Sequence, residues 1–120
     1  MNFQNKLFSV LTDPNLHFIS CDELESEIQK VLNEEKILKY VDTKMKKEFW
    51  YYYFESVEYH KIKSSVKLSR DKKDNYLLSL AKDSKVDFLI TGDKDLLVLK
   101  KFENTSIITL SEFLPYLNKK

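Results

Sequence analysis

The sequence predicts an α/β fold with a parallel sheet and helices on both of its faces. Short apolar runs typical of strands alternate with segments of helical hydrophobic period in the second half of the chain. This alternation favours parallel strands joined by crossover helices. The clearest strand is the apolar run 86–90, and Gly92 then allows the chain to turn sharply at its end.

The first expected elements are a helix, a turn and a strand. Apolar residues recur at helical spacing over residues 3–11, and Asp-Pro-Asn at 13–15 ends that helix with a turn. Residues 16–19 form a short β-prone run. Ser20 followed by Glu23 has the spacing of a capping box and predicts that the next helix begins there.

That helix is expected to end near Asn33, and residues 36–40 add a helical turn. Asp42 or Thr43 is the predicted cap of a longer helix, which contains the aromatic block 49–54. Consecutive aromatic residues cannot share one helical face. Some of them therefore lie at a partner surface, at a substrate groove or in a partly exposed shell, while the others pad the helix against the sheet.

The second half of the chain contains a basic loop, residues 61–73, which holds the local excess of positive charge. The other elements expected here are an edge strand at 57–62, a helix from Asp71 or Lys72 to about Asp83, the strand at 86–90, a helical turn at 96–99, a strand at 106–110 and a final helix capped by Ser111.

Composition limits the class of protein. The 120 residues are 42% hydrophobic, enough for one buried core, so we expect a single domain over residues 1–120. Lys and Arg number 20 against 19 Asp and Glu, and the net charge of +1 gives no overall attraction to nucleic acid or membrane. Cys21 is the only cysteine, which excludes an internal disulfide. A single cysteine also fits a reducing compartment, so we expect a cytoplasmic protein. The sequence has no membrane-length apolar segment and no signal peptide, so we expect the protein to be soluble.

Asp93 and Asp95 follow the carboxyl end of the expected strand 86–90. Ligands bind at that edge of open α/β sheets, and clustered carboxylates offer the hard oxygen ligands that Mg²⁺ or Mn²⁺ prefers. The alternative is a solvated Asp-rich turn that caps the following helix. These two residues alone do not decide between a metal site and a cap, so other acids that converge on them matter.

Two further acids occupy core-facing positions of their helices. Glu27 lies at the edge of the apolar stripe of its helix, whereas Glu23 and Glu25 face away from it. A carboxylate beside the core is costly unless it is paired or bound to a metal, although an edge acid can also reach solvent or a lysine. Asp74 is the first residue on the buried face of its helix. The helix dipole stabilises an acid in the first turn whatever the function of the protein.

Three separate segments thus place an acid at a strand end or a core-facing position. Asp71 has the same first-turn explanation as Asp74 and is more exposed. Like charges about 4 Å apart repel by roughly 4 kcal/mol per pair at an effective dielectric near 20. A cation would be needed to hold such acids together.

These residues resemble the PIN-domain family, in particular the ribonuclease toxins of bacterial toxin–antitoxin systems. The matching blocks are CDELESEI, which ends in Glu27, RDKKDN with Asp74 followed by YLLSLA, VDFLITGDKDL, and the tail IITLSEFL. The resemblance covers nearly the whole chain. It implies a three-layer α/β/α fold around a mostly parallel sheet, Mg²⁺ or Mn²⁺ bound by acidic residues, and cleavage of single-stranded RNA.

The resemblance also implies roles for individual residues. Glu27, Asp74 and Asp93 match the family's metal-site acids, Asp95 is an auxiliary catalytic acid, and Thr91 is a supporting hydroxyl. Metal ions held by carboxylates lower the pKa of bound water and neutralise charge on the leaving oxygen. Such chemistry needs no catalytic histidine.

One family feature is missing from this chain. Family members begin with an apolar strand that ends in Asp-Thr-Asn and supplies another metal-site aspartate, and this chain starts after that point. Asp13 follows a helix and precedes a turn proline, so it is not the substitute. A sheet without its central strand exposes unpaired backbone and favours a homo-oligomer such as a dimer. We expect such a site to hold metals weakly, which puts the activity of this chain in doubt.

The leading hypothesis is therefore a metal-dependent endoribonuclease, the toxin of a toxin–antitoxin system, with an antitoxin protein as its partner. The alternative is a non-catalytic PIN-like scaffold or a protein- or RNA-binding module, with the aromatic block 49–54 as its interface. A plain α/β domain with accidental acids would require the matching blocks to be coincidental. The basic loop supplies the expected contacts to RNA phosphates, unless it is only a solvated loop. Its cations are Lys61, Lys63, Lys67, Arg70, Lys72 and Lys73.

Overall fold

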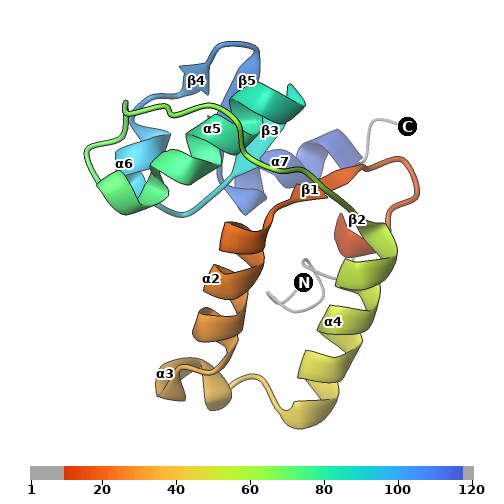
Figure 1. The fold of residues 1–120 in the computed structure, drawn as a ribbon. Helices are drawn as coiled ribbons and strands as arrows, with labels where there is room; N and C mark the ends of the chain where they lie inside the picture. The colour runs from red at the N-terminus through yellow and green to blue at the C-terminus, as the bar shows by residue number, and fades with distance from the viewer. Residues whose placement is uncertain (1–9, 118–120) are drawn as a thin grey trace. The chain divides into compact units, whose positions relative to one another are not determined.

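The computed structural model describes residues 10–117 and divides into two compact units, Met1–Tyr59 and His60–Lys120. Figure 1 shows that each unit combines helices with strands, which confirms the predicted α/β class. Nearly all of the helix expected at residues 3–11 lies outside the described residues. The single domain over residues 1–120 stays a prediction.

The unit Met1–Tyr59 holds two parallel strands with helices between them. Its strands pair from Phe18 opposite Val57 to Ser20 opposite Tyr59, so the strand expected at 57–62 is shorter than predicted. The elements in chain order are β1 (Phe18–Ser20), α2 (Asp22–Leu32), α3 (Glu35–Leu38), α4 (Thr43–Ser56) and β2 (Val57–Tyr59).

Two predicted helix caps in this unit have different outcomes. Asp42 caps α4 as expected, because its carboxylate accepts a 2.8 Å hydrogen bond from the amide of Met45. The prediction of a capping box at Ser20 is wrong, since α2 begins after Cys21 without a side-chain cap. Ser20 instead ends β1 as a buried residue, and its hydroxyl lies 2.5 Å from the hydroxyl of Tyr53 on α4. A tertiary hydrogen bond thus replaces the local one.

The unit His60–Lys120 holds a mixed three-stranded sheet in the order β3-β5-β4. Strands β3 and β5 are parallel, as predicted, whereas β4 pairs antiparallel with β5 and was not expected from the sequence. The elements are the 3₁₀ turn η1 (Lys72–Asp74), α5 (Asn75–Ser84), β3 (Phe88–Ile90), α6 (Lys94–Leu97), β4 (Lys101–Phe102), β5 (Thr105–Ile108) and α7 (Leu110–Leu117).

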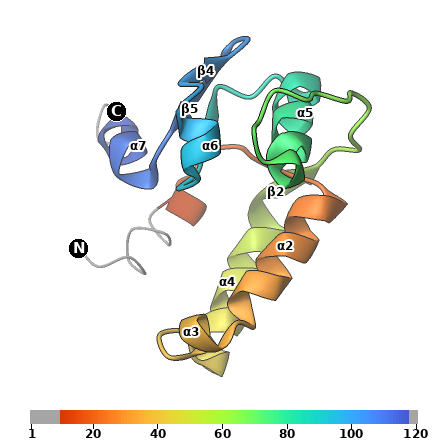
Figure 2. The same cartoon turned by 90° about the vertical axis from the view of Figure 1, so that its left-hand side faces the viewer.

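Helices cover both faces of this sheet. Leu89 packs against the buried cluster that Leu78 of α5, Leu96 of α6 and Ile107 of β5 form. Phe88 points to the opposite face, because successive strand side chains alternate, and its ring contacts Phe113 and Tyr116 of α7. Figure 2 shows α5 and α7 on opposite sides of the strands. Within this unit the order of layers is therefore helix, sheet, helix.

The last helix, α7, is capped two residues before the predicted cap Ser111. The hydroxyl of Thr109 accepts a 3.2 Å hydrogen bond from the amide of Glu112, and the Glu112 carboxylate accepts one of 3.0 Å from the amide of Thr109. This reciprocal pair is a capping box, and it lowers the pKa of Glu112. The prediction that Ser111 caps the helix is therefore wrong. Among residues 10–117, no helix is both long enough and apolar enough to span a membrane.

Candidate metal centre

The loop after β3 turns tightly and carries Thr91, Asp93 and Asp95. The amide of Asp93 donates a 3.0 Å hydrogen bond to the hydroxyl of Thr91, and the amide of Asp95 donates one of 2.8 Å to Asp93 Oδ1. Asp93 is thus the cap of α6, as the alternative to a metal site predicted. The cap occupies Oδ1, and capping does not exclude a second role for the carboxylate.

Asp74 stands where η1 meets α5, and it is the buried acid of this unit, with 8% of its surface exposed. Although it occupies the cap position of α5, its side chain makes no capping hydrogen bond. The helix-capping explanation of this acid therefore does not account for where its carboxylate points. The prediction that Asp74 faces inward is confirmed.

Asp71 is a third acid at the same place, and it was not among the predicted site residues. Its carboxylate accepts a 3.0 Å hydrogen bond from the amide of Lys73 and caps η1. In a 3₁₀ turn, residues three apart lie above one another, so Asp71 and Asp74 come to the same side. The signal in the sequence was the spacing of these two acids at the start of a helix.

The carboxylates of Asp71, Asp74 and Asp93 converge, with one oxygen of each within 4.8 Å of the others. A hydrogen bond from Asp74 holds the pKa of Asp93 below its usual range, and the backbone amides of Asp95 and Leu96 act in the same direction. Fully ionised carboxylates at this distance repel by roughly 3.5 kcal/mol per pair at an effective dielectric of 20. A cation would remove this repulsion.

This donor set fits a hard divalent cation. Carboxylate oxygens on a turn and a strand end are the ligands that Mg²⁺ and Mn²⁺ take in proteins, often together with water. One of the three groups, Asp74, is buried, and the other two are half-buried and reach solvent. The cluster thus has one buried carboxylate and two that solvent can reach.

Glu27 belongs to α2, in the other unit of the chain. The expectation that it lies beside the core is wrong, because its side chain is exposed. Glu25, which was expected to face away, is the more buried acid and accepts a hydrogen bond from the hydroxyl of Tyr59. The apolar stripe of α2 is itself only half-buried, so its edge does not bury Glu27. The role of Glu27 as a metal ligand stays a prediction.

The basic loop presents all its cations to solvent. It runs from the end of β2 to η1 without regular secondary structure up to residue 68. Its six exposed cations are Lys61, Lys63, Lys67, Arg70, Lys72 and Lys73. Lys72 and Lys73 belong to the same turn as Asp71 and Asp74, so positive charge adjoins the acidic cluster along the chain.

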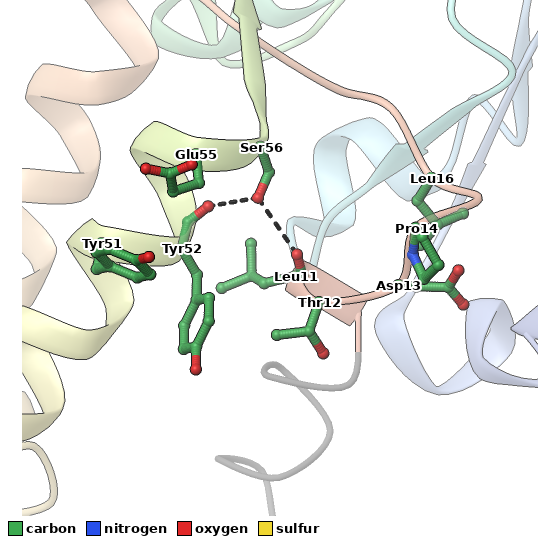
Figure 3. A pocket seen from close by; sticks show the side chains of 9 residues that line it. All are labelled: Leu11, Thr12, Asp13, Pro14, Leu16, Tyr51, Tyr52, Glu55 and Ser56. Atoms are coloured by element: carbon green, nitrogen blue, oxygen red, sulfur yellow. Dashed lines mark hydrogen bonds between the residues drawn. The ribbon is translucent and has the colours of Figure 1, made fainter.

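A separate pocket of about 450 Å³ lies within the unit Met1–Tyr59. Figure 3 shows its lining by α4 and by the turn after residue 11. The hydroxyl of Ser56 ties these two parts together, because it donates to the carbonyls of Tyr52 and Leu11. Asp13 lines this pocket and accepts a 2.8 Å hydrogen bond from the amide of Asn15, as expected of a turn residue.

Comparison with protein families assigns the class of protein. The family model described as PIN domain matches residues 3–95, which is well over half of the chain. The chain therefore belongs to the PIN-domain family. The matched range contains Glu27 and all three acids of the cluster. No curated protein and no solved structure matches the chain.

Proposed function

We propose that this PIN-domain protein is a metal-dependent endoribonuclease, the toxin of a toxin–antitoxin system, which cleaves single-stranded RNA. The observation that carries the proposal is the convergence of Asp71, Asp74 and Asp93 beside the end of β3 in a chain of this family. Asp74 is the most informative of the three, because it is buried and does not cap its helix. A bound cation would stabilise the ionised form of a buried carboxylate.

The proposed chemistry assigns a task to each residue. Mg²⁺ or Mn²⁺ bound by carboxylates lowers the pKa of a bound water and neutralises charge on the leaving oxygen. Asp71, Asp74 and Asp93 are the proposed ligands, and Glu27 is a further one from the resemblance. Thr91 keeps the loop tight through its hydrogen bond with the Asp93 amide.

Asp95 and the basic loop complete the proposal. Asp95 is half-buried beside Asp93 and is the proposed auxiliary acid. The exposed cations of the loop attract the phosphates of the RNA, an interaction that weakens with salt. The antitoxin partner rests on the family resemblance alone.

Metal binding is the first test. Calorimetric titration with Mn²⁺ is expected to show saturable binding by the unmodified chain and none by Asp74→Asn or Asp93→Asn. Asp87→Asn is the matched control, because Asp87 is an exposed acid of the same unit outside the cluster. Equal Mn²⁺ affinity in Asp74→Asn and Asp87→Asn would contradict the assignment.

Cleavage of a fluorescent single-stranded RNA is the second test. We expect Mn²⁺-dependent cleavage that EDTA stops, and that the double variant Asp74→Asn, Asp93→Asn abolishes. Undiminished cleavage by this double variant would place the chemistry elsewhere. Glu27→Gln, assayed separately, tests whether α2 contributes to catalysis.

A non-catalytic binding module is the second candidate, and the aromatic surface of α4 favours it. Tyr53 is 4% exposed and pads the helix, whereas Tyr51 and Phe54 are 63% and 57% exposed. Large exposed aromatic side chains are typical of interfaces. A second copy of the chain is the proposed occupant. Light scattering of the unmodified chain and of Tyr51→Ser, Phe54→Ser tests this, since a dimer should become monomeric in the double variant.

A further inference from the structure

Helix α5 holds the basic loop through its side chains. Asp83 Oδ2 accepts hydrogen bonds from the amides of Lys63 (2.6 Å) and Ser64 (2.9 Å), and Asp83 Oδ1 accepts one from the Ser64 hydroxyl. These three donors lower the pKa of Asp83 to about 2, with the Ser64 hydroxyl as the largest cause. The ionised carboxylate of Asp83 therefore fixes the start of the loop by these hydrogen bonds.

Two more side chains of α5 continue this contact toward the other end of the loop. Ser79 Oγ accepts a 2.9 Å hydrogen bond from the amide of Val66, and Asn75 Oδ1 accepts one of 2.8 Å from the amide of Ser69. With Asp83, these residues stand four apart and share one helical face, which spans about 12 Å. The loop runs antiparallel to α5, because its residues from 63 to 69 contact α5 residues from 83 back to 75. Figures 1 and 2 both show it alongside that helix.

The fixed segment, residues 63–69, has a defined inner and outer side. Val66 packs against the buried cluster of the unit, and Ile62 and Ser64 are also half-buried. The side chains between them point outward and are mostly cationic. These exposed residues are Lys61, Lys63, Ser65 and Lys67, and the alternation ends at Leu68, which is 59% exposed. The alternation means that the loop is an ordered arm with lysines on its outer side. Its lysines therefore extend from fixed backbone positions.

We propose that Asn75, Ser79 and Asp83 are positioning residues that hold residues 63–69 as a fixed lysine arm for the phosphates of single-stranded RNA. This inference rests on the proposed function, since it assigns the substrate contact of the same protein. A backbone that is already fixed loses less conformational freedom when its lysines contact phosphates. The arm also leads directly into the turn that carries Asp71, so substrate held on the arm is held near the acids.

Binding of a fluorescent single-stranded oligouridylate in EDTA tests the arm without the metal. We expect Ser79→Ala and Asp83→Asn each to weaken binding by roughly three- to tenfold, the value of one or two lost hydrogen bonds. The controls are Ser84→Ala, whose hydroxyl bonds only within α5, and Asp87→Asn. Hydrogen exchange at the arm amides should accelerate in the two arm variants alone.

Two further measurements separate positioning from general loss of structure. In cleavage assays the arm variants should raise KM and leave kcat and Mn²⁺ affinity unchanged. In a Lys63→Ala, Lys67→Ala background, Ser79→Ala should weaken binding no further. Removing these two lysines should also reduce the slope of log K against log salt by about 1.4.

Several outcomes would overturn the inference. Arm amides that exchange faster with unchanged oligouridylate affinity would show that the arm does not serve RNA. Full additivity of Ser79→Ala with the lysine changes, or no binding of oligouridylate by the unmodified chain, would do the same. Mn²⁺ binding is measured separately by calorimetry, whereas oligouridylate binding is measured in EDTA. A failure of the metal proposal can therefore be told from a failure of the arm proposal. If Ser79→Ala does not fold, Asp83→Asn decides alone, because Asp83 is only half-buried whereas Ser79 is buried.

Discussion

Asp74→Asn should stabilise the protein without metal and make it insensitive to metal. Each fully ionised pair in the cluster costs roughly 3.5 kcal/mol at 4.8 Å and a dielectric of 20. The hydrogen bond between Asp74 and Asp93 and the solvent at the open side of the site reduce this cost. We therefore expect a net gain of about 1 kcal/mol in the free energy of unfolding, as for other functional sites that carry uncompensated charge.

Metal should reverse the order of stability of the two proteins. At a Mn²⁺ concentration of 100 times Kd, binding to the native state adds about 2.7 kcal/mol to the unmodified chain, while the variant gains nothing. For a chain of this length 1 kcal/mol corresponds to about 4 °C in Tm. The variant should melt about 4 °C higher in EDTA, and the unmodified chain should rise by about 10 °C in Mn²⁺.

Thermal unfolding followed by circular dichroism, in EDTA and across a Mn²⁺ series, measures both effects. Asp87→Asn removes the same charge from an exposed position and should keep the full metal response. A variant that is less stable in EDTA and keeps the metal response would refute the reasoning. Asp74 would then be an acid that the fold needs for its own hydrogen bonds.

Three further predictions concern the fold. Asp83 has a pKa lowered to about 2, so its hold on the arm is complete above about pH 4 and is lost as the pH falls toward 2, and hydrogen exchange at the arm amides should show this loss. Ser20→Ala removes the 2.5 Å hydrogen bond between Ser20 and the Tyr53 hydroxyl, which keeps its hydrogen bond with Tyr59, and should cost about 1 kcal/mol in urea unfolding. Thr109→Ala should cost about 1 kcal/mol by the same assay and Ser111→Ala almost nothing, because Thr109 is the cap of α7.

The spacing of a capping box occurs at two places in the chain, and the hydrogen bonds of a capping box form at one of them. Thr109 and Glu112 form a capping box, and Ser20 and Glu23 have the same spacing without forming one. The difference lies outside the motif, because Ser20 is buried at the end of β1 and its hydroxyl meets Tyr53 from α4. Local sequence cannot reveal a partner 33 residues away. Asp42 is exposed, and its carboxylate caps α4 through the amide of Met45 as predicted.

The hydrophobic period of the helices predicted the burial of Asp74 correctly and that of Glu27 incorrectly, and the packing of the two helices explains the difference. Helix α5 packs against a sheet and buries Leu78, Leu80 and Ala81, so a residue that heads its apolar face is buried too. Helix α2 buries none of its residues in the described structure, so its apolar stripe says little about burial. Hydrophobic period indicates which face is apolar, and the packing partner decides whether that face is covered.

The two explanations offered for the acids from the sequence, helix cap and metal ligand, do not exclude each other at every position. Asp93 caps α6 with Oδ1 and also joins the cluster, and Asp71 caps η1 in the same way. Both would be favourable where they stand even in a protein without metal. Asp74 is different, because it is the most buried of the three and its carboxyl makes no cap. Replacement of Asp74 therefore tests the metal-ligand explanation separately from helix capping, whereas replacement of Asp71 or Asp93 would remove a cap and a proposed ligand together.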